Sequence, residues 1–94
     1  LMFNGMVTAV LVLDSEGQLA SSPAVNSRGV FGDDDGVREE ESLQQEIVTA
    51  FYALTASKRE NKEEMREAIR LVIRRKIRTK YEIRPDIHID LVQL

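Results

Sequence analysis

Residues 6–13 read Met6-Val7-Thr8-Ala9-Val10-Leu11-Val12-Leu13. The stretch is apolar and rich in β-branched side chains, which is typical of a β-strand. Side chains alternate between the two faces of a strand, so one face carries Val7, Ala9, Leu11 and Leu13, and the other carries Met6, Thr8, Val10 and Val12. A strand that is apolar on both faces is either central and covered twice, or covered once here and once by something outside this chain.

The residues that follow predict a β-hairpin. Asp14-Ser15-Glu16-Gly17 is a turn, because Gly17 can take the positive φ that closes a short hairpin. The chain then returns as a weaker strand from Gln18 to about Val25. Pro23 has no N–H to donate to a ladder, so this strand is expected at an edge of the sheet. Residues 26–29 are expected to be its irregular exit.

An acidic segment, Gly32-Asp33-Asp34-Asp35-Gly36, comes next. Three adjacent carboxylates could attract a divalent cation, but the alternating ligands and distal glutamate of a calcium loop are missing. A solvated loop is therefore the preferred interpretation.

The apolar period then changes to that of helices. The first helix is expected from about Val37 to Ser57 and the second from about Lys62 to Thr79, with Asn61 as N-cap and Glu64 at the capping-box spacing. The first apolar stripe consists of Leu43, Ile47, Phe51 and Leu54, widened by Val48 and Ala50. The second consists of Met65, Ala68, Ile69, Val72, Ile73 and Ile77.

Residues Asp86 to Val92 alternate between polar and apolar side chains, which predicts a last strand with Ile87, Ile89 and Leu91 on one face. The element order is therefore β-β-α-α-β. The hairpin makes the first two strands antiparallel, and the helices return the chain so that the last strand pairs with the free edge of the first, parallel to it. We expect an α+β two-layer fold of the α/β type: a three-stranded mixed sheet of order 2-1-3, with two helices on one face and nothing on the other.

Length and composition narrow the classes of function. The chain has 94 residues, one histidine, no cysteine and a net charge of −3, so it forms a single small domain without disulfides or thiolate metal sites. No apolar run approaches the roughly 20 residues of a membrane span. Because the sequence starts at Leu1, we expect it to be a fragment of a longer protein.

The basic residues are concentrated in the second helix. Between Met65 and Lys80 the sequence has seven lysines and arginines and one acid, Glu67. Either this is a solvated face whose arginines pair with neighbouring glutamates, or it contacts nucleic-acid phosphates. The solvated or protein-facing interpretation is preferred. The candidate RNA contacts are Arg70, Arg74, Arg75 and Arg78.

Catalytic motifs are missing from the sequence. It contains neither a phosphate-binding loop nor a G-x-S-x-G elbow. His88 shares a strand face with Asp86 and Asp90, which could support acid–base chemistry or a metal, but no nucleophile or further ligand accompanies them. A surface or interfacial histidine is the preferred interpretation.

Several segments resemble the C-terminal domain of ribonuclease J. These are Asn4 to Val10, Leu13 to Gly17, Pro23 to Val30, and the basic helix end followed by Arg84-Pro85 and a closing strand. This family of bacterial and plastid ribonucleases has catalytic metallo-β-lactamase and β-CASP domains. The resemblance implies that residues 1–94 follow those domains, which are absent here, and that the parent is a cytoplasmic zinc- or manganese-dependent ribonuclease. The family's H-x-H-x-D-H motif has no counterpart here, so no catalytic, cofactor or metal residue is expected in this chain. Arg28-Gly29 carries over only as a structural turn.

Two functions follow as expectations. The first is assembly, as a homo-oligomer or against the parent's catalytic domains, through the uncovered sheet face. That face would carry His88 and Asp90 beside Thr8, Val10 and Val12, or beside the alternate residue set of the same strand. The second, ranked lower, is contact with RNA through the basic helix. No membrane partner is expected, and nothing in the sequence indicates a small-molecule pocket.

Overall fold

The computed structural model describes residues 5–31, 36–81 and 83–94. Its sheet contains β1 (Met6–Leu13), β2 (Ala24–Arg28) and β3 (Asp86–Gln93) in the order β2-β1-β3, with β1 antiparallel to β2 and parallel to β3. Its helices are α1 (Gly36–Ala53), α2 (Ala56–Glu60) and α3 (Lys62–Tyr81). The predicted strand order and strand directions are confirmed.

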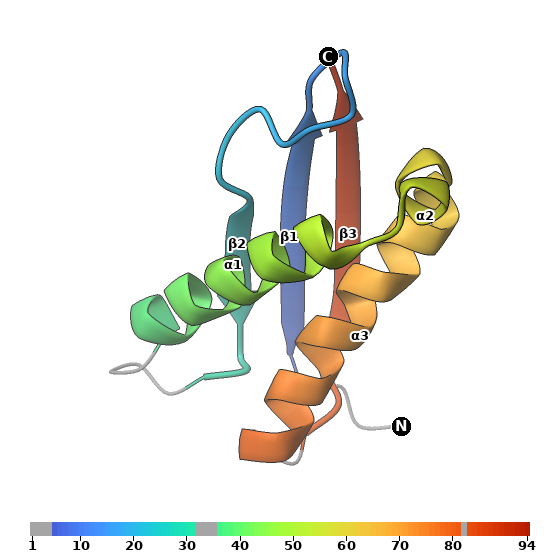
Figure 1. Cartoon of the computed structure of the whole chain (residues 1–94). Coiled ribbons are helices and arrows are strands. Elements are labelled where there is room, and N and C mark those ends of the chain that lie inside the picture. Colours follow the sequence, from blue (N-terminus) through green and yellow to red (C-terminus); the bar gives the residue numbers. More distant parts are fainter. Residues whose placement is uncertain (1–4, 32–35, 82) are drawn as a thin grey trace.

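The helices lie on one side of the sheet (Figure 1). Burial alternates along β1, and Val7, Ala9, Leu11 and Leu13 are the residues that face the helices. The helical and β3 side chains that meet them are Leu43, Ile47, Phe51, Met65, Ile69, Ile73, Ile77, Ile87 and Ile89. This single core explains both predicted helix stripes and confirms that β1 is covered once by the described chain.

The hairpin turn is as predicted, but the second strand is not. Gly17 has a φ of +78°, and the Asp14 carboxylate accepts hydrogen bonds from the backbone N–H groups of Glu16 and Gln18. Residues 18–23 contribute only an isolated bridge between Leu13 and Leu19. The strand itself begins after the buried Pro23 and occupies residues 24–28, most of which were expected to be irregular. Its position at the sheet edge is confirmed.

Two glycines explain why pairing ends where it does. Gly5 and Gly29 have φ values of +93° and +69° and approach each other beside the first β1–β2 pair. A Cβ on Gly5 would lie 2.4 Å from the carbonyl oxygen of Arg28, a distance that no side chain tolerates. The backbones can therefore approach this closely only with glycine at position 5.

The region between the long helices differs from the prediction. The first helix ends at Ala53, and residues 56–60, predicted to break the pattern, form α2, which makes three helices in place of two. The Thr55 hydroxyl accepts from the N–H of Lys58 and begins α2. Arg59 donates to the carbonyl of Tyr52 and lies 5.2 Å from the ring centroid of Phe51, which fixes α2 against the end of α1.

Asn61 begins α3 as predicted, with its side chain accepting from the N–H groups of Glu63 and Glu64. Its own N–H donates to the carbonyl of Lys58. The helix continues past Thr79 to Tyr81, whose ring packs 5.2 Å from that of Phe31. The predicted acidic loop lies outside the described residues, apart from Gly36, the first residue of α1.

Candidate functional site

One face of the sheet is not covered by any helix, and we call it the open sheet face. The registers arrange its side chains in rows across β2, β1 and β3. The rows are Arg28–Met6–Asp86, Asn26–Thr8–His88, Ala24–Val10–Asp90 and, without a β2 residue, Val12–Val92. Thus the structure brings all five predicted interface residues onto one face and resolves which residue set of β1 is uncovered.

The open sheet face is apolar along its centre and charged at its two edges. The β1 residues on it are half-buried by their neighbours, and Val92 on β3 is 38% exposed. Arg28 is exposed at the β2 edge, whereas Asp86 and Asp90 are exposed at the β3 edge. The Nε2 atom of His88 lies 3.3 Å from an Asp86 carboxylate oxygen, and more than half of each side chain is exposed. Charge of opposite sign therefore lies at opposite edges.

The sequence missed two residues of this face, Asn26 and Arg28. Both were assigned to an irregular segment because the second strand was placed too early. Their signal was present in the alternation of Ala24, Asn26 and Arg28 with Val25 and Ser27. The Ser27 hydroxyl and N–H both donate to a Glu40 carboxylate oxygen, each at 2.7 Å, which turns this set toward the helices.

The basic residues of α3 divide into two groups. In the first half of the helix the arginines are held within the domain: Arg66 donates to the carbonyl of Ile89 and pairs with Glu63, and Arg70 pairs with Glu67. These pairs match the solvated interpretation of the sequence. In the second half, Arg74, Arg75 and Arg78 are exposed, and within the described part of the chain they have no acidic partner.

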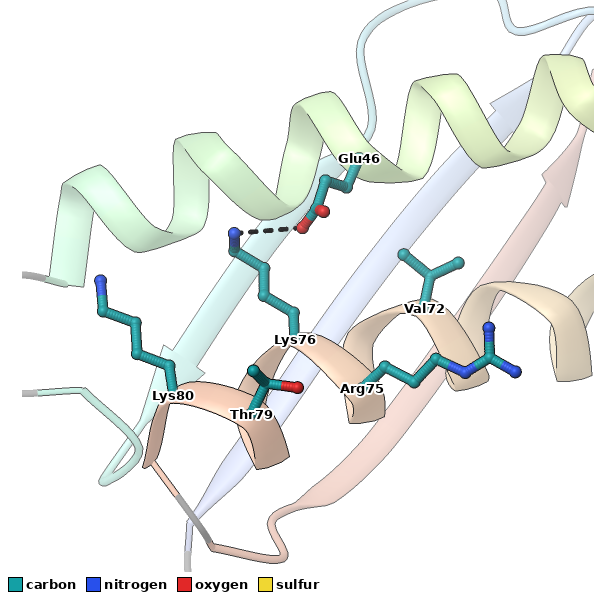
Figure 2. A pocket seen from close by; sticks show the side chains of 6 residues that line it. All are labelled: Glu46, Val72, Arg75, Lys76, Thr79 and Lys80. Carbon is teal, nitrogen blue, oxygen red and sulfur yellow. Dashed lines mark ion pairs between the residues drawn. The ribbon is translucent and has the colours of Figure 1, made fainter.

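A cleft of about 500 Å³ lies between α1 and α3 (Figure 2). Its bases are largely neutralised, because Lys76 lies 3.1 Å from Glu46 and Lys80 lies 2.6 Å from the buried carboxylate of Glu39. Figure 2 shows Lys76 and Glu46 pointing toward each other across the gap, while Arg75 extends along the surface of α3. The cleft therefore holds one unpaired base, Arg75, among the described residues.

A second hollow, of about 340 Å³, lies where α3 passes residues 83–85. Arg74 and Arg78 line it from the helix, and Ile83, Arg84 and Pro85 line it from the segment that leads into β3. In contrast to the cleft of Figure 2, this hollow has no acidic residue in its lining. We call it the arginine hollow.

The described residues do not resemble a catalytic or metal centre. Across residues 5–31, 36–81 and 83–94, no three His, Cys, Asp or Glu side chains are grouped so that they could hold a metal ion. The zinc or manganese that the sequence resemblance implies for the parent therefore finds no donor set in this part of the chain. No helix within these ranges is long and apolar enough to cross a bilayer.

Comparison with known proteins agrees with this arrangement. The family model described as the ribonuclease J C-terminal domain matches residues 1–94, which is the whole chain. A search of curated proteins gives no match. The match covers the sheet, the helices and both surfaces described above. The chain belongs to the ribonuclease J C-terminal domain family, a family of ribonucleases.

Proposed function

We propose that this chain is the non-catalytic accessory domain of a ribonuclease J and that it associates with a second copy of itself through the open sheet face. The observation that carries the proposal is the state of β1. Met6, Val10 and Val12 are apolar, yet they lie on the side of the sheet that no described element covers. Apolar surface of this kind marks an interaction site, because covering it removes it from water.

The charges of the open sheet face support a second copy as the occupant. Two identical sheets that face each other are related by a two-fold axis lying between them. An axis parallel to β1 places β2 of one copy opposite β3 of the other without changing the level along the strands. Arg28 and Asp86 share the level of Met6, so each Arg28 then lies opposite Asp86 of the second copy.

The same axis gives acceptable neighbours to the other rows. Asn26 lies opposite His88, an amide against an imidazole, and Ala24 lies opposite Asp90 at the edge. The residues of β1 meet their own counterparts along the axis. An axis across the strands would instead stack β3 on β3 and bring the acidic side chains of both copies to one side, which like-charge repulsion disfavours.

Sedimentation of the chain at increasing concentration tests the proposal. Val10→Asp removes two valines from the centre of the interface and places two carboxylates against each other. Burial of a valine contributes at least about 1.5 kcal/mol, so two losses raise the dissociation constant by at least about 100-fold. Circular dichroism should show that the variant keeps its fold, because position 10 is only half-buried.

Leu71→Asp is the matched control, since Leu71 is 42% exposed on α3, away from the open sheet face. It makes the same kind of change and should leave association intact. A chain that stays monomeric at every concentration would contradict self-association and leave the face to the parent's catalytic domains. Equal weakening by both substitutions would contradict the choice of face.

A further inference from the structure

The second half of α3 carries positive charge that the domain does not neutralise. Four basic residues of this helix, Arg66, Arg70, Lys76 and Lys80, contact a glutamate. Arg74 and Arg78 do not contact any acidic residue in the described ranges, although Glu63 and Glu67 serve the arginines one and two turns earlier. The difference separates bases that complete the fold from bases that the fold leaves available.

We propose that the arginine hollow binds the phosphate backbone of single-stranded RNA, with Arg74 and Arg78 as the phosphate ligands. The two residues are four positions apart, so their side chains emerge on the same flank of α3, one turn from each other. Two neighbouring guanidinium groups repel each other, and an anion between them removes that repulsion. Each guanidinium offers a planar set of donors that matches two phosphate oxygens.

The size and lining of the hollow fit a nucleotide better than a bare ion. Its volume of about 340 Å³ is within the range of sites that enclose small organic ligands. Ile83 and Pro85 provide an apolar wall for a sugar or a base, and Arg84 adds a third guanidinium to the lining. The residues combine electrostatic attraction to the backbone with a sequence-tolerant apolar contact, as in other single-strand grooves.

RNA is favoured over an acidic protein because of the family and the charge pattern. The chain belongs to a ribonuclease family, so its parent meets RNA as substrate. The excess of basic residues extends along α3 beyond the hollow, to Arg75 beside the cleft of Figure 2. A polyanion with a charge on every residue can use such an extended surface, whereas a single carboxylate uses one point of it.

This inference is independent of self-association. The arginine hollow is formed by α3 and the segment before β3, whereas the open sheet face lies on the opposite side of the sheet from the helices (Figure 1). RNA binding and association can therefore fail separately, and each has its own measurement.

Fluorescence anisotropy of a labelled dodecauridylate, titrated with the chain at several NaCl concentrations, tests the site. Arg74→Gln/Arg78→Gln removes both phosphate ligands and keeps good helix formers. We expect the affinity at low salt to fall at least about tenfold, and the slope of log K against log salt to become shallower by about one. Lys58→Gln/Lys62→Gln removes the same charge from exposed positions near the start of α3 and should weaken binding much less.

Three outcomes would overturn the inference. One is the absence of binding at low salt. Another is equal weakening by the two double variants, which would indicate attraction to net charge and not a site. The third is a decaglutamate peptide that binds as tightly as the oligonucleotide with the same dependence on Arg74 and Arg78, which would assign the hollow to an acidic protein segment.

Discussion

Exchanging the charges of Arg28 and Asp86 tests the axis of the proposed dimer. In the arrangement with the axis parallel to β1, each Arg28 lies opposite Asp86 of the second copy, so a dimer contains two such pairs. Arg28→Asp turns both attractions into repulsions, and so does Asp86→Arg. The double variant carries both changes and restores two attractions with the partners reversed.

The magnitude follows from the position of the pair. Arg28 is exposed, and the Asp86 side chain is 55% exposed in the single chain, so the pair lies at the rim of the interface. A rim pair contributes up to about 1 kcal/mol. Reversing one charge changes each pair by about 2 kcal/mol and the dimer by about 4 kcal/mol, which raises the dissociation constant roughly 500- to 1000-fold. The double variant should return to within about threefold of the original chain.

Sedimentation velocity over a dilution series measures these constants, and raising the salt concentration should shrink the effect of each single variant. Arg28→Asp/Asp90→Arg is the control, because Asp90 lies four residues along β3 from Asp86 and opposite Ala24 in this arrangement. It should not restore association to the same extent. Single variants that associate normally, or a double variant as weak as either single one, would refute the axis.

Two further predictions concern stability, measured by urea unfolding. Gly5→Ala should lose at least about 2 kcal/mol, since its Cβ meets the carbonyl oxygen of Arg28 at a φ of +93°. Gly17→Ala has a similar φ but open space around it and should lose only about 1 kcal/mol, so equal losses would show that the close contact is not the cause. Ser27→Ala removes a hydroxyl donor from the Glu40 carboxylate and should lose about 1.5 kcal/mol, and an unchanged midpoint would mean that this bond does not hold β2 to α1.

The elements that could be predicted from the sequence are those whose own side chains specify the face they bury. Along β3, apolar residues alternate strictly with polar ones, and the buried side chains are Ile87 and Ile89, as expected. Along α3, Met65, Ile69 and Ile73 repeat at helical spacing and are fully buried. In both cases a local pattern coincides with burial because one face of the element packs against the same core.

The start of β2 could not be predicted because contacts from α1 determine it. The Gln44 side chain donates to the carbonyl of Pro23 at 2.6 Å, and Glu40 accepts from Ser27. These partners are 13 and 21 positions away in the sequence, and no periodicity within residues 18–28 reports them. The cost was functional as well as structural, since Arg28 was not recognised as a residue of the open sheet face.

The short helix α2 was missed for a related reason. Its residues are polar and none is buried, so it has no apolar stripe to detect. Capping by Thr55 and the contact of Arg59 with the end of α1 stabilise it. A five-residue helix of this kind depends on contacts at its ends and not on an internal pattern.

The two proposed surfaces have a consequence for the assembled protein. If two sheets meet at the open sheet face, the helices of both copies lie on the outside of the dimer, because they cover the opposite side of each sheet (Figure 1). The arginine hollows then lie on the outer surfaces, near α3 of each copy, and association covers neither of them. Val10→Asp should therefore leave the affinity for dodecauridylate per chain unchanged, and Arg74→Gln/Arg78→Gln should leave the dissociation constant of the dimer unchanged. Loss of RNA binding in a monomeric Val10→Asp variant would mean that the RNA surface is built from both copies, and it would contradict this separation.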